Sequence, residues 1–429
     1  MPTSPPAVEA GPPVHARGAA RRVALWVLVV QCLLALSWTL YVLFLPGLLE
    51  QAHLDRSWLP TILIADQLIF AACDWLAGVY ADRVALVWRR LGRVMTAVGL
   101  LSSALLLAMP WVATTGSSVA LLATIFVWIA TSSALRSPVF ALLGRVREDA
   151  TGTRRAGMVS IALVGISLAG AFGPYLTTLL RGLDPRLPLG LSALSLAAAG
   201  LWALHAEQLL PRPTVADESL ATRSVARRRA WWLAAITFVA ALGAQSITVL
   251  LAPPLLARFV GTDAVVWAAW FWAGFGIGLA PGTRLTTISH PFIGAAVALG
   301  VGAIAFFACA ASGMFAFVVA GLIVAGCGWG VFATIAFTSA VTLSKGRALL
   351  RGAGTASGML FSAFALAIVA RLLFVSSGLG RAPWTVWLPL ITWVVAAILL
   401  LIATRTVWRP WGEGDTLRDV SAGEASSPA

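Results

Sequence analysis

"CDWLAGVYADRVALVWRRLGR" spans residues 73–93 and marks the point where a long apolar stretch meets a basic one. Asp74 lies inside the apolar stretch, Asp82 lies where it ends, and Gly78 lies midway between them. Arginine recurs after Asp82. This pattern predicts a bilayer-crossing helix that ends in a basic loop and holds one acid at depth, where a charge needs a partner or a wet cavity.

The composition places the whole chain in a membrane. Of its 429 residues, 59% are hydrophobic and only 11% are charged, whereas a soluble domain carries about 25% charged residues. The apolar residues also gather in blocks longer than about 18 residues, the length of a spanning helix. A soluble enzyme with a large core is excluded.

The hydropathy pattern predicts an all-α integral membrane protein with twelve spanning helices, and the internal repeat described below divides them into two six-helix bundles. The expected spans are 22–47, 58–82, 92–113, 118–145, 155–180, 187–208, 230–257, 262–282, 290–310, 314–343, 352–376 and 383–406. We expect a disordered cytosolic tail at 1–21, an N-terminal bundle at 22–208, a cytosolic linker at 209–229, a C-terminal bundle at 230–406 and a cytosolic tail at 407–429.

The net charge of +13 comes almost entirely from arginine. With both termini inside the cell, most of the arginines fall in cytosolic loops and tails, as the positive-inside rule predicts. The expected outer loops hold only Arg56, Arg181, Arg186, Arg258 and Arg381. Topology therefore explains the basic balance, and we expect the partner to be a lipid bilayer rather than nucleic acid.

Metal and cofactor chemistry has no support in the sequence. The four cysteines fall in apolar segments without metal or redox spacing, and the four histidines are scattered. We predict no metal site, no cofactor and no catalytic residues. A membrane-embedded enzyme would show acids and histidines clustered at one membrane face, and no such cluster occurs.

The two halves of the sequence resemble each other. "SWTLYVLFLPGLL" from Ser37 aligns without gaps with "AQSITVLLAPPLL" from Ala244, so that Pro46 falls on Pro253. Basic turns after the fourth and tenth spans, and after the second and eighth, also correspond in order. Such parallel halves, related by an axis along the membrane normal, describe one major transporter architecture.

Two short motifs extend this reading. "GVYADR", with Gly78, Asp82 and Arg83, resembles the loop 2–3 signature of the major facilitator superfamily. "GISLAGAFGPYL" in the fifth span resembles the glycine-proline motif of that family's antiporters. Its matching residues are Gly165, Gly170, Gly173 and Pro174. The resemblance implies a secondary transporter that exports its solute.

The resemblance also implies a cytosolic latch. Asp82 would meet the start of the eleventh span and a basic residue at the end of the fourth, such as Arg145, and so hold the two halves together. A helix N-terminus and an arginine both favour a carboxylate. The alternative is that Asp82 is a solvated loop acid.

Depth arithmetic pairs two charges inside the N-terminal half. Asp74 lies ~12 Å deeper than Asp82, and Arg136 lies ~13 Å deeper than Arg145, at ~1.5 Å per residue. We therefore predict an ion pair between Asp74 and Arg136. The pair either serves transport or only joins two helices.

A second pair lies farther from the basic boundary. Asp66 and Arg371 reach similar heights by the same arithmetic, and the resemblance implies that the second and eleventh spans meet. We predict that they form an outer gate; the alternative is that both lie in water near the outer surface. A carboxyl in a low-dielectric site can load and release a proton. Since Arg136 would hold Asp74 ionised, Asp66 is the preferred proton carrier, and the alternative is facilitated diffusion.

The duplicated stretch also indicates a substrate cavity, because the resemblance implies that the first and seventh spans line it. The expected lining residues are Gln31, Trp38, Thr39, Tyr41, Gln245, Ser246 and Thr248. Each could instead bond one helix to another.

Together these patterns favour a monomeric secondary active transporter of a small solute, with both termini in the cytoplasm, in a bacterial cytoplasmic (inner) membrane. We expect it to alternate access, to couple to protons and to export. A transport-fold sensor or partner-binding subunit is the alternative.

Overall fold

The computed structural model describes residues 14–87, 91–146, 153–210, 220–343 and 352–406, and within these residues the chain is helical with no strand. This confirms the all-α prediction. The longer helices are α1 (Val14–Gln51), α2 (Leu59–Val87), α3 (Leu91–Thr114), α4 (Ser118–Arg136), α6 (Arg154–Leu180), α7 (Arg186–Leu201), α9 (Leu220–Gln245), α12 (Trp270–Leu285), α13 (Pro291–Ala311), α14 (Phe315–Thr342), α15 (Ala353–Ser376) and α16 (Leu388–Thr406). The shorter ones used below are α5 (Pro138–Gly144), α8 (Ala203–Gln208), the π-helix η2 (Ser246–Leu251), α10 (Ala252–Val260) and α11 (Ala264–Ala268).

Eleven helical stretches among the described residues are long and apolar enough to cross a membrane, judged by length and composition. The predicted span 262–282 is the exception, because it is not one continuous helix: α11 ends at Ala268 and α12 begins at Trp270. α12 has 16 residues, or ~24 Å at ~1.5 Å per residue, against a hydrocarbon core of ~30 Å. The count of twelve therefore stays a prediction that depends on α12.

Two helices begin before the start of the predicted spans that they overlap. α1 begins at Val14, inside the expected disordered tail, and α9 begins at Leu220, inside the expected linker 209–229. Both extensions are rich in alanine and arginine, which favour helix. Hydropathy marks only the part of a helix that lipid covers, so it misses such extensions. The tail residues 1–13 and 407–429 lie outside the described residues.

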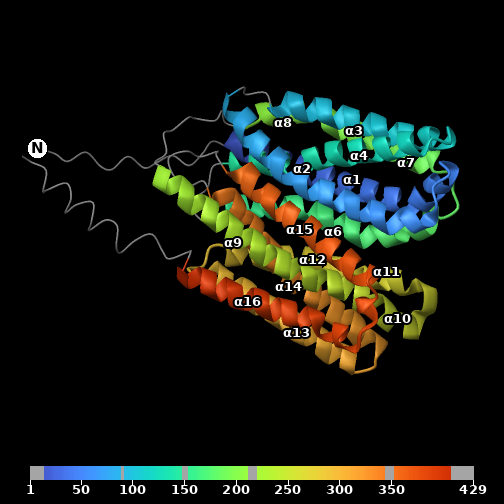
Figure 1. Cartoon of the computed structure of the whole chain (residues 1–429). Coiled ribbons are helices and arrows are strands. Elements are labelled where there is room, and N and C mark those ends of the chain that lie inside the picture. The colour runs from blue at the N-terminus through green and yellow to red at the C-terminus, as the bar shows by residue number, and fades with distance from the viewer. Residues whose placement is uncertain (1–13, 88–90, 147–152, 211–219, 344–351, 407–429) are drawn as a thin grey trace, which may run out of the picture.

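The helices form two groups in space. Figure 1 shows α1 to α8, coloured blue to green, above α9 to α16, coloured yellow-green to red. Helices α2 and α15 pack along each other between the groups, and so do α6 and α12. We call the end of the molecule where α1, α3, α9 and α15 begin the basic end.

Glycines on both sides let α2 and α15 approach closely. A side chain at Gly78 would collide with the carbonyl of Gly354, and one at Gly358 would collide with the carbonyl of Asp74. One further turn along α15, the Ser362 hydroxyl donates to the Ala71 carbonyl at 2.6 Å. Small residues four apart on α15 thus form one face, the usual geometry for close packing in membranes.

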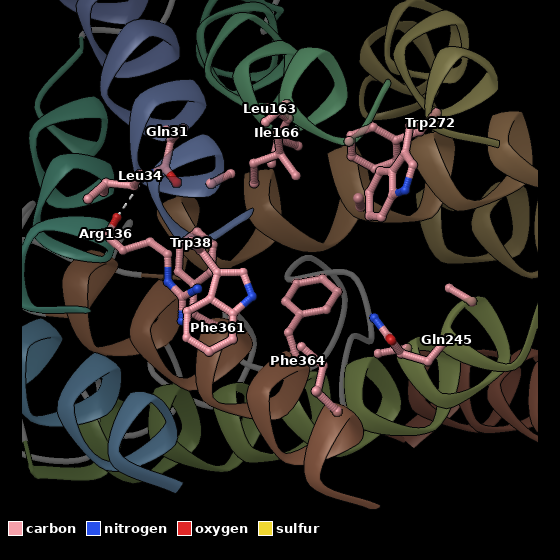
Figure 2. A pocket seen from close by; sticks show the side chains of 18 of the residues that line it. Gln31, Leu34, Trp38, Arg136, Leu163, Ile166, Gln245, Trp272, Phe361 and Phe364 are labelled. Carbon is pink, nitrogen blue, oxygen red and sulfur yellow. Dashed lines mark hydrogen bonds between the residues drawn. The ribbon is translucent and has the colours of Figure 1, made fainter. Parts of the chain in front are cut away.

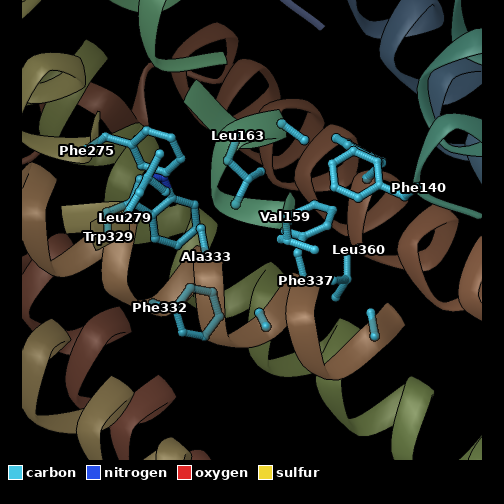
Figure 3. Close-up of a cluster of buried hydrophobic side chains, with 14 of the residues drawn as sticks. Phe140, Val159, Leu163, Phe275, Leu279, Trp329, Phe332, Ala333, Phe337 and Leu360 are labelled. Atoms are coloured by element: carbon cyan, nitrogen blue, oxygen red, sulfur yellow. The ribbon is translucent and has the colours of Figure 1, made fainter. Parts of the chain in front are cut away.

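A similar face joins α12 and α14 within the C-terminal group. A side chain at Gly274 would meet the Ile323 carbonyl, and one at Gly326 would meet the Phe271 carbonyl. Larger side chains fill the space between the groups. Figure 3 shows Val159 and Leu163 of α6 among aromatic side chains of α12 and α14.

The α12–α14 contact gives the first prediction. Gly326→Ala should lower the free energy of unfolding by about 1–3 kcal/mol, because the new methyl group must push the two backbones apart. The measurement is thermal unfolding in detergent. Gly300→Ala is the matched control, since nothing lies within 4 Å of the added carbon there. Equal stability of the two variants would contradict the close contact.

Candidate functional site: a central cavity and its closures

A cavity of about 270 Å³ lies between the two groups of helices. Side chains from α1, α2, α4, α6, α9, η2, α12, α14 and α15 line it. Figure 2 shows Arg136 and Gln31 on one side and Gln245 on the other, with the rings of Trp38, Phe361 and Phe364 between them. The cavity therefore has polar groups at two ends and a flat apolar middle.

Most of the predicted cavity residues border this space. The lining includes Gln31, Trp38, Thr39, Gln245 and Thr248.

Tyr41 and Ser246 are not among the lining residues. Tyr41 is fully buried, and its hydroxyl donates to Asp66 instead. Ser246 follows Gln245, and one residue is about 100° around a helix, so its hydroxyl faces away and donates to the Leu242 carbonyl at 2.7 Å. Alignment of the repeats located the helices but did not determine which face they present.

Aromatic residues supply much of the wall that sequence reasoning missed. These are Phe70, Trp128, Phe271, Trp272, Phe275, Trp329, Phe337, Phe361 and Phe364. Gln67 and Ser132 were missed as well. In a chain with 19 tryptophans and 19 phenylalanines, aromatic residues also mark membrane interfaces, so composition alone cannot single out the cavity.

Asp74 and Arg136 form an ion pair next to the cavity. Asp74 is fully buried, and Arg136 donates to both of its carboxylate oxygens, through Nε to Oδ1 at 3.3 Å and through Nη2 to Oδ2. The Ser133 hydroxyl also donates to Oδ1, at 2.8 Å. Arg136 is one of the cavity residues, whereas Asp74 lies behind it. The carboxylate thus has the partners that a buried charge requires.

Two rings cover the Arg136 guanidinium. Its central carbon lies 4.7 Å from the centre of the Phe70 ring and 5.1 Å from that of Phe361. About 25% of the Arg136 side chain remains exposed. Since Phe361 belongs to α15, the ion pair within the N-terminal group also contacts the C-terminal group.

Asp66 has a different environment. It is fully buried, its Oδ2 accepts a hydrogen bond from the Tyr41 hydroxyl at 2.8 Å, and its Oδ1 has no partner among the described residues. The Arg371 Nε is also buried and without a partner within the described chain. The ion pairs that join described residues do not include one between Asp66 and Arg371, so the predicted gate pair is apart in this state.

Asp82 joins the two groups at the basic end. Its carboxylate accepts hydrogen bonds from the backbone N–H of Gly352 at 3.2 Å, Gly354 at 2.9 Å and Thr355 at 2.7 Å, and from the Thr355 hydroxyl at 2.6 Å. Gly352 has φ +124°, which a residue with a side chain rarely adopts. Asp82 therefore caps α15, a stabilising place for a negative charge.

Arg145 and Arg83 do not join this cap. Arg145 lies 3.7 Å from Glu207, close enough for an ion pair but too far for a hydrogen bond. Glu207 itself accepts from the backbone N–H groups of Leu91 and Gly92 and so caps α3. The predicted contact between Arg145 and Asp82 is wrong, because Arg145 pairs with Glu207 of α8 instead. Burial lowers the pKa of Arg145 and the charge of Glu207 opposes this. Arg83 is exposed.

The fifth-span motif lies in α6, at its contacts with α1 and α12. A side chain at Gly165 would meet the Leu28 carbonyl of α1, and one at Gly170 would meet the Trp272 ring of α12. Gly173 lies against Thr39 of α1, and Pro174 lies within α6. The motif therefore allows close helix packing beside the cavity, where Gly170 is itself part of the lining.

Aromatic rings of both groups of helices pack together beside the cavity, on the side toward the basic end. Phe140 of α5 lies 5.1 Å from Phe337 of α14 and 5.4 Å from Phe361 of α15, measured between ring centres. All three are buried. Phe337 and Phe361 also line the cavity, and the α5 residue Phe140 lies in the chain between the cavity residue Arg136 and the cap of α5 at Arg145. No group of three or more metal-ligating side chains occurs in the part of the chain described.

The Asp82 cap gives a prediction about closure. Asp82→Ala should increase the population with an open basic end about tenfold or more, since one charge-assisted hydrogen bond contributes about 1.5–3 kcal/mol and a tenfold shift requires about 1.4 kcal/mol. Electron-spin distance measurements between labels at the exposed positions Arg21 and Arg228 should show a longer component. Asp184→Ala, which removes a hydrogen bond from the Arg186 backbone N–H within one group, should leave the distance unchanged. An unaltered distance in Asp82→Ala would rule out the cap as a closure.

The Asp74–Arg136 pair gives a prediction about stability. Arg136→Gln should lower the free energy of unfolding by about 3–5 kcal/mol, because it leaves a buried charge unpaired. Asp74→Asn should cost less, because Arg136 is partly exposed, and the double variant should recover most of the loss. The exposed pair Glu50–Arg56, removed as Glu50→Gln with Arg56→Gln, should change stability by less than about 1 kcal/mol. Unfolding in detergent measures all four; a double variant as unstable as Arg136→Gln would contradict the coupling.

Comparison with known proteins supports the architecture. No known family model matches the sequence, and no curated protein matches it. The structure is similar to that of the human organic anion transporter MFSD10 (TETRAN), with a TM-score of 0.62 and 17% identity over 90% of this chain and 99% of that one. It is also similar to the E. coli fucose:proton symporter FucP, in its N162A form (TM-score 0.58, 18% identity) and in an outward conformation (TM-score 0.60, 17% identity), each over 89% of this chain and 98% of that one. The chain therefore has the fold of major facilitator superfamily transporters.

Proposed function

We propose that this protein is a secondary active transporter that carries a small organic solute across a membrane by alternating access. The observation that supports this best is the central cavity between the two groups of helices, closed toward the basic end by the Asp82 cap and the layer around Phe140. Rocking one group against the other would break these closures and open the cavity toward the basic end.

The proposal includes a topology. The arginine distribution supports a cytosolic basic end, with both termini inside and two six-helix bundles, residues 22–208 and 230–406, joined by a linker near 209–229. We place the protein as a monomer in a bacterial cytoplasmic membrane. The state described here would then be closed to the cytosol.

Protons are the proposed driving ion, and Asp66 is their proposed carrier. A buried carboxylate without a countercharge is costly, and a bound proton removes that cost. Asp74 has Arg136 beside it, whereas Asp66 has only the Tyr41 hydroxyl and an unpartnered Oδ1. When the outer end closes, Arg371 of α15 would meet Asp66 of α2, and the proton would leave. This exchange links protonation to the position of the two groups.

The direction of transport rests on the glycine motif of α6. Its resemblance to antiporter motifs supports proton-driven export. Of the structural neighbours named above, MFSD10 is called an organic anion transporter and FucP a fucose:proton symporter, which supports a small solute and proton coupling as the proposal for this chain.

A transport assay tests the proposal and its coupling together. Purified protein in vesicles with a trapped pH-sensitive dye should move protons when a transported compound from a panel of small organic solutes is added. Asp66→Asn should still bind that compound but lose nearly all proton movement, because an amide cannot release a proton. Glu50→Gln, an exposed acid at the end of α1, should behave as the parent protein.

Two results would overturn parts of the proposal. Compound flux without proton movement would indicate facilitated diffusion and remove Asp66 as carrier. A compound that binds in the cavity but never crosses would favour a sensor over a transporter.

A further inference from the structure

We propose that the cavity binds a small organic anion, with its carboxylate against Arg136 and a flat apolar body among the aromatic rings. This inference deepens the proposed function and rests on it only in treating the cavity as the transport site. It is carried by the arrangement of charge and hydrogen-bond donors around the cavity.

Arg136 offers the ligand one free edge. A guanidinium has five N–H groups in a planar fork. Asp74 takes the edge formed by Nε and Nη2, and the central carbon lies 4.7 Å and 5.1 Å from the centres of the Phe70 and Phe361 rings. No hydrogen bond between described residues uses Nη1. About a quarter of this side chain is exposed, and Nη1 is not among the buried atoms that lack a partner. The edge formed by Nη1 and the second N–H of Nη2 therefore remains for a ligand, and it suits the two oxygens of a carboxylate.

The charge of the lining has one sign. Arg136 contributes a positive charge, and the described lining contains no aspartate or glutamate. Asp74 is fully buried behind the guanidinium and does not border the cavity. Asp74 balances the charge of Arg136 but lies behind it, so an organic cation in the cavity would meet the guanidinium first, and the electrostatics at short range disfavour a cationic ligand.

The hydroxyl groups of the lining add few free donors. Those of Thr39, Ser132 and Thr248 already donate to carbonyls of their own helices. Gln245, across the cavity from Arg136 (Figure 2), has no hydrogen bond to another described residue. A second acceptor on the ligand, at the end away from the carboxylate, would suit its amide.

The aromatic lining and the volume of the cavity indicate the shape and size of the apolar part of the ligand. The rings of Trp38, Phe361 and Phe364 lie between the two polar ends (Figure 2), and aromatic faces pack best on flat apolar groups. A volume of about 270 Å³ is near the lower end of organic ligand sites, about 300–1,000 Å³. A compound of one or two fused rings matches this space.

A matched trio of ligands tests the inference in detergent, without transport. Indole-3-acetate, indole-3-acetamide and tryptamine share one ring system and differ in the charge of the side group. Calorimetry at pH 7 should show the acetate binding about tenfold or more tightly than the acetamide, since a charge-assisted bidentate contact is about twice as strong as a neutral one. Tryptamine should bind most weakly.

A neutral replacement of the ion pair is the decisive variant. Asp74→Asn with Arg136→Gln avoids an unpaired buried charge, and it should bind the acetate and the acetamide equally. Glu50→Gln with Arg56→Gln, which removes an exposed ion pair outside the cavity, should keep the preference of the parent protein.

Several outcomes would overturn the inference. They are binding of the amide or the amine as tightly as the acid, a preference for the acid that survives in the neutral double variant, and failure of every member of a panel of one- and two-ring carboxylates to bind. Movement of amines or neutral compounds in vesicles would reject the anion while leaving transport intact. Carboxylates that bind but never cross the membrane would reject transport while leaving the anion site intact.

Discussion

The close contact of α2 and α15 is the constraint on which the remaining structure depends. Gly78, Gly354 and Gly358 bring the two backbones together, and only at that spacing can the Asp82 carboxylate reach the first N–H groups of α15. The same contact brings Phe361 over Arg136 beside the cavity. A single helix pair thus connects the closure at the basic end with the wall of the central site.

Helix α2 carries three acids eight residues apart, and each has a different environment. Eight residues turn a helix by about 80° beyond two full turns, so the acids face different neighbours. Asp82 caps α15, Asp74 pairs with Arg136 of α4, and Asp66 contacts Tyr41 of α1. One joins the two groups, one is neutralised within its own group, and one lacks a countercharge. This separation lets a single helix combine a closure, the partner of the cavity residue Arg136 and the proposed proton carrier.

The sequence indicates well how deep a residue lies in the membrane, but it indicates poorly which way the side chain of that residue faces. A fixed rise per residue was enough to set Asp74 at the height of Arg136, and the spacing of apolar residues located the helices. Rotation about a helix axis is harder, because apolar residues surround a membrane helix on all sides. The repeat therefore predicts Tyr41 and Ser246 at the cavity, although both face away from it. The predicted partner of Arg145 is Asp82 rather than Glu207, because nothing in the sequence indicates that Glu207, at the end of α8, lies beside Arg145. The aromatic wall was missed for a related reason, since the same residue types serve the membrane interface.

The central claim is that the two ends of the molecule open in alternation. Spin labels at the exposed positions Arg21 and Arg228 report the basic end, and labels at the exposed positions Leu179 of α6 and Phe259 of α10 report the opposite end. Distances for both pairs, measured in vesicles across a range of pH, test it directly. The account predicts that whenever the first distance lengthens the second shortens, with the two populations changing in equal proportion. Distances that lengthen together, or that never change, would contradict it.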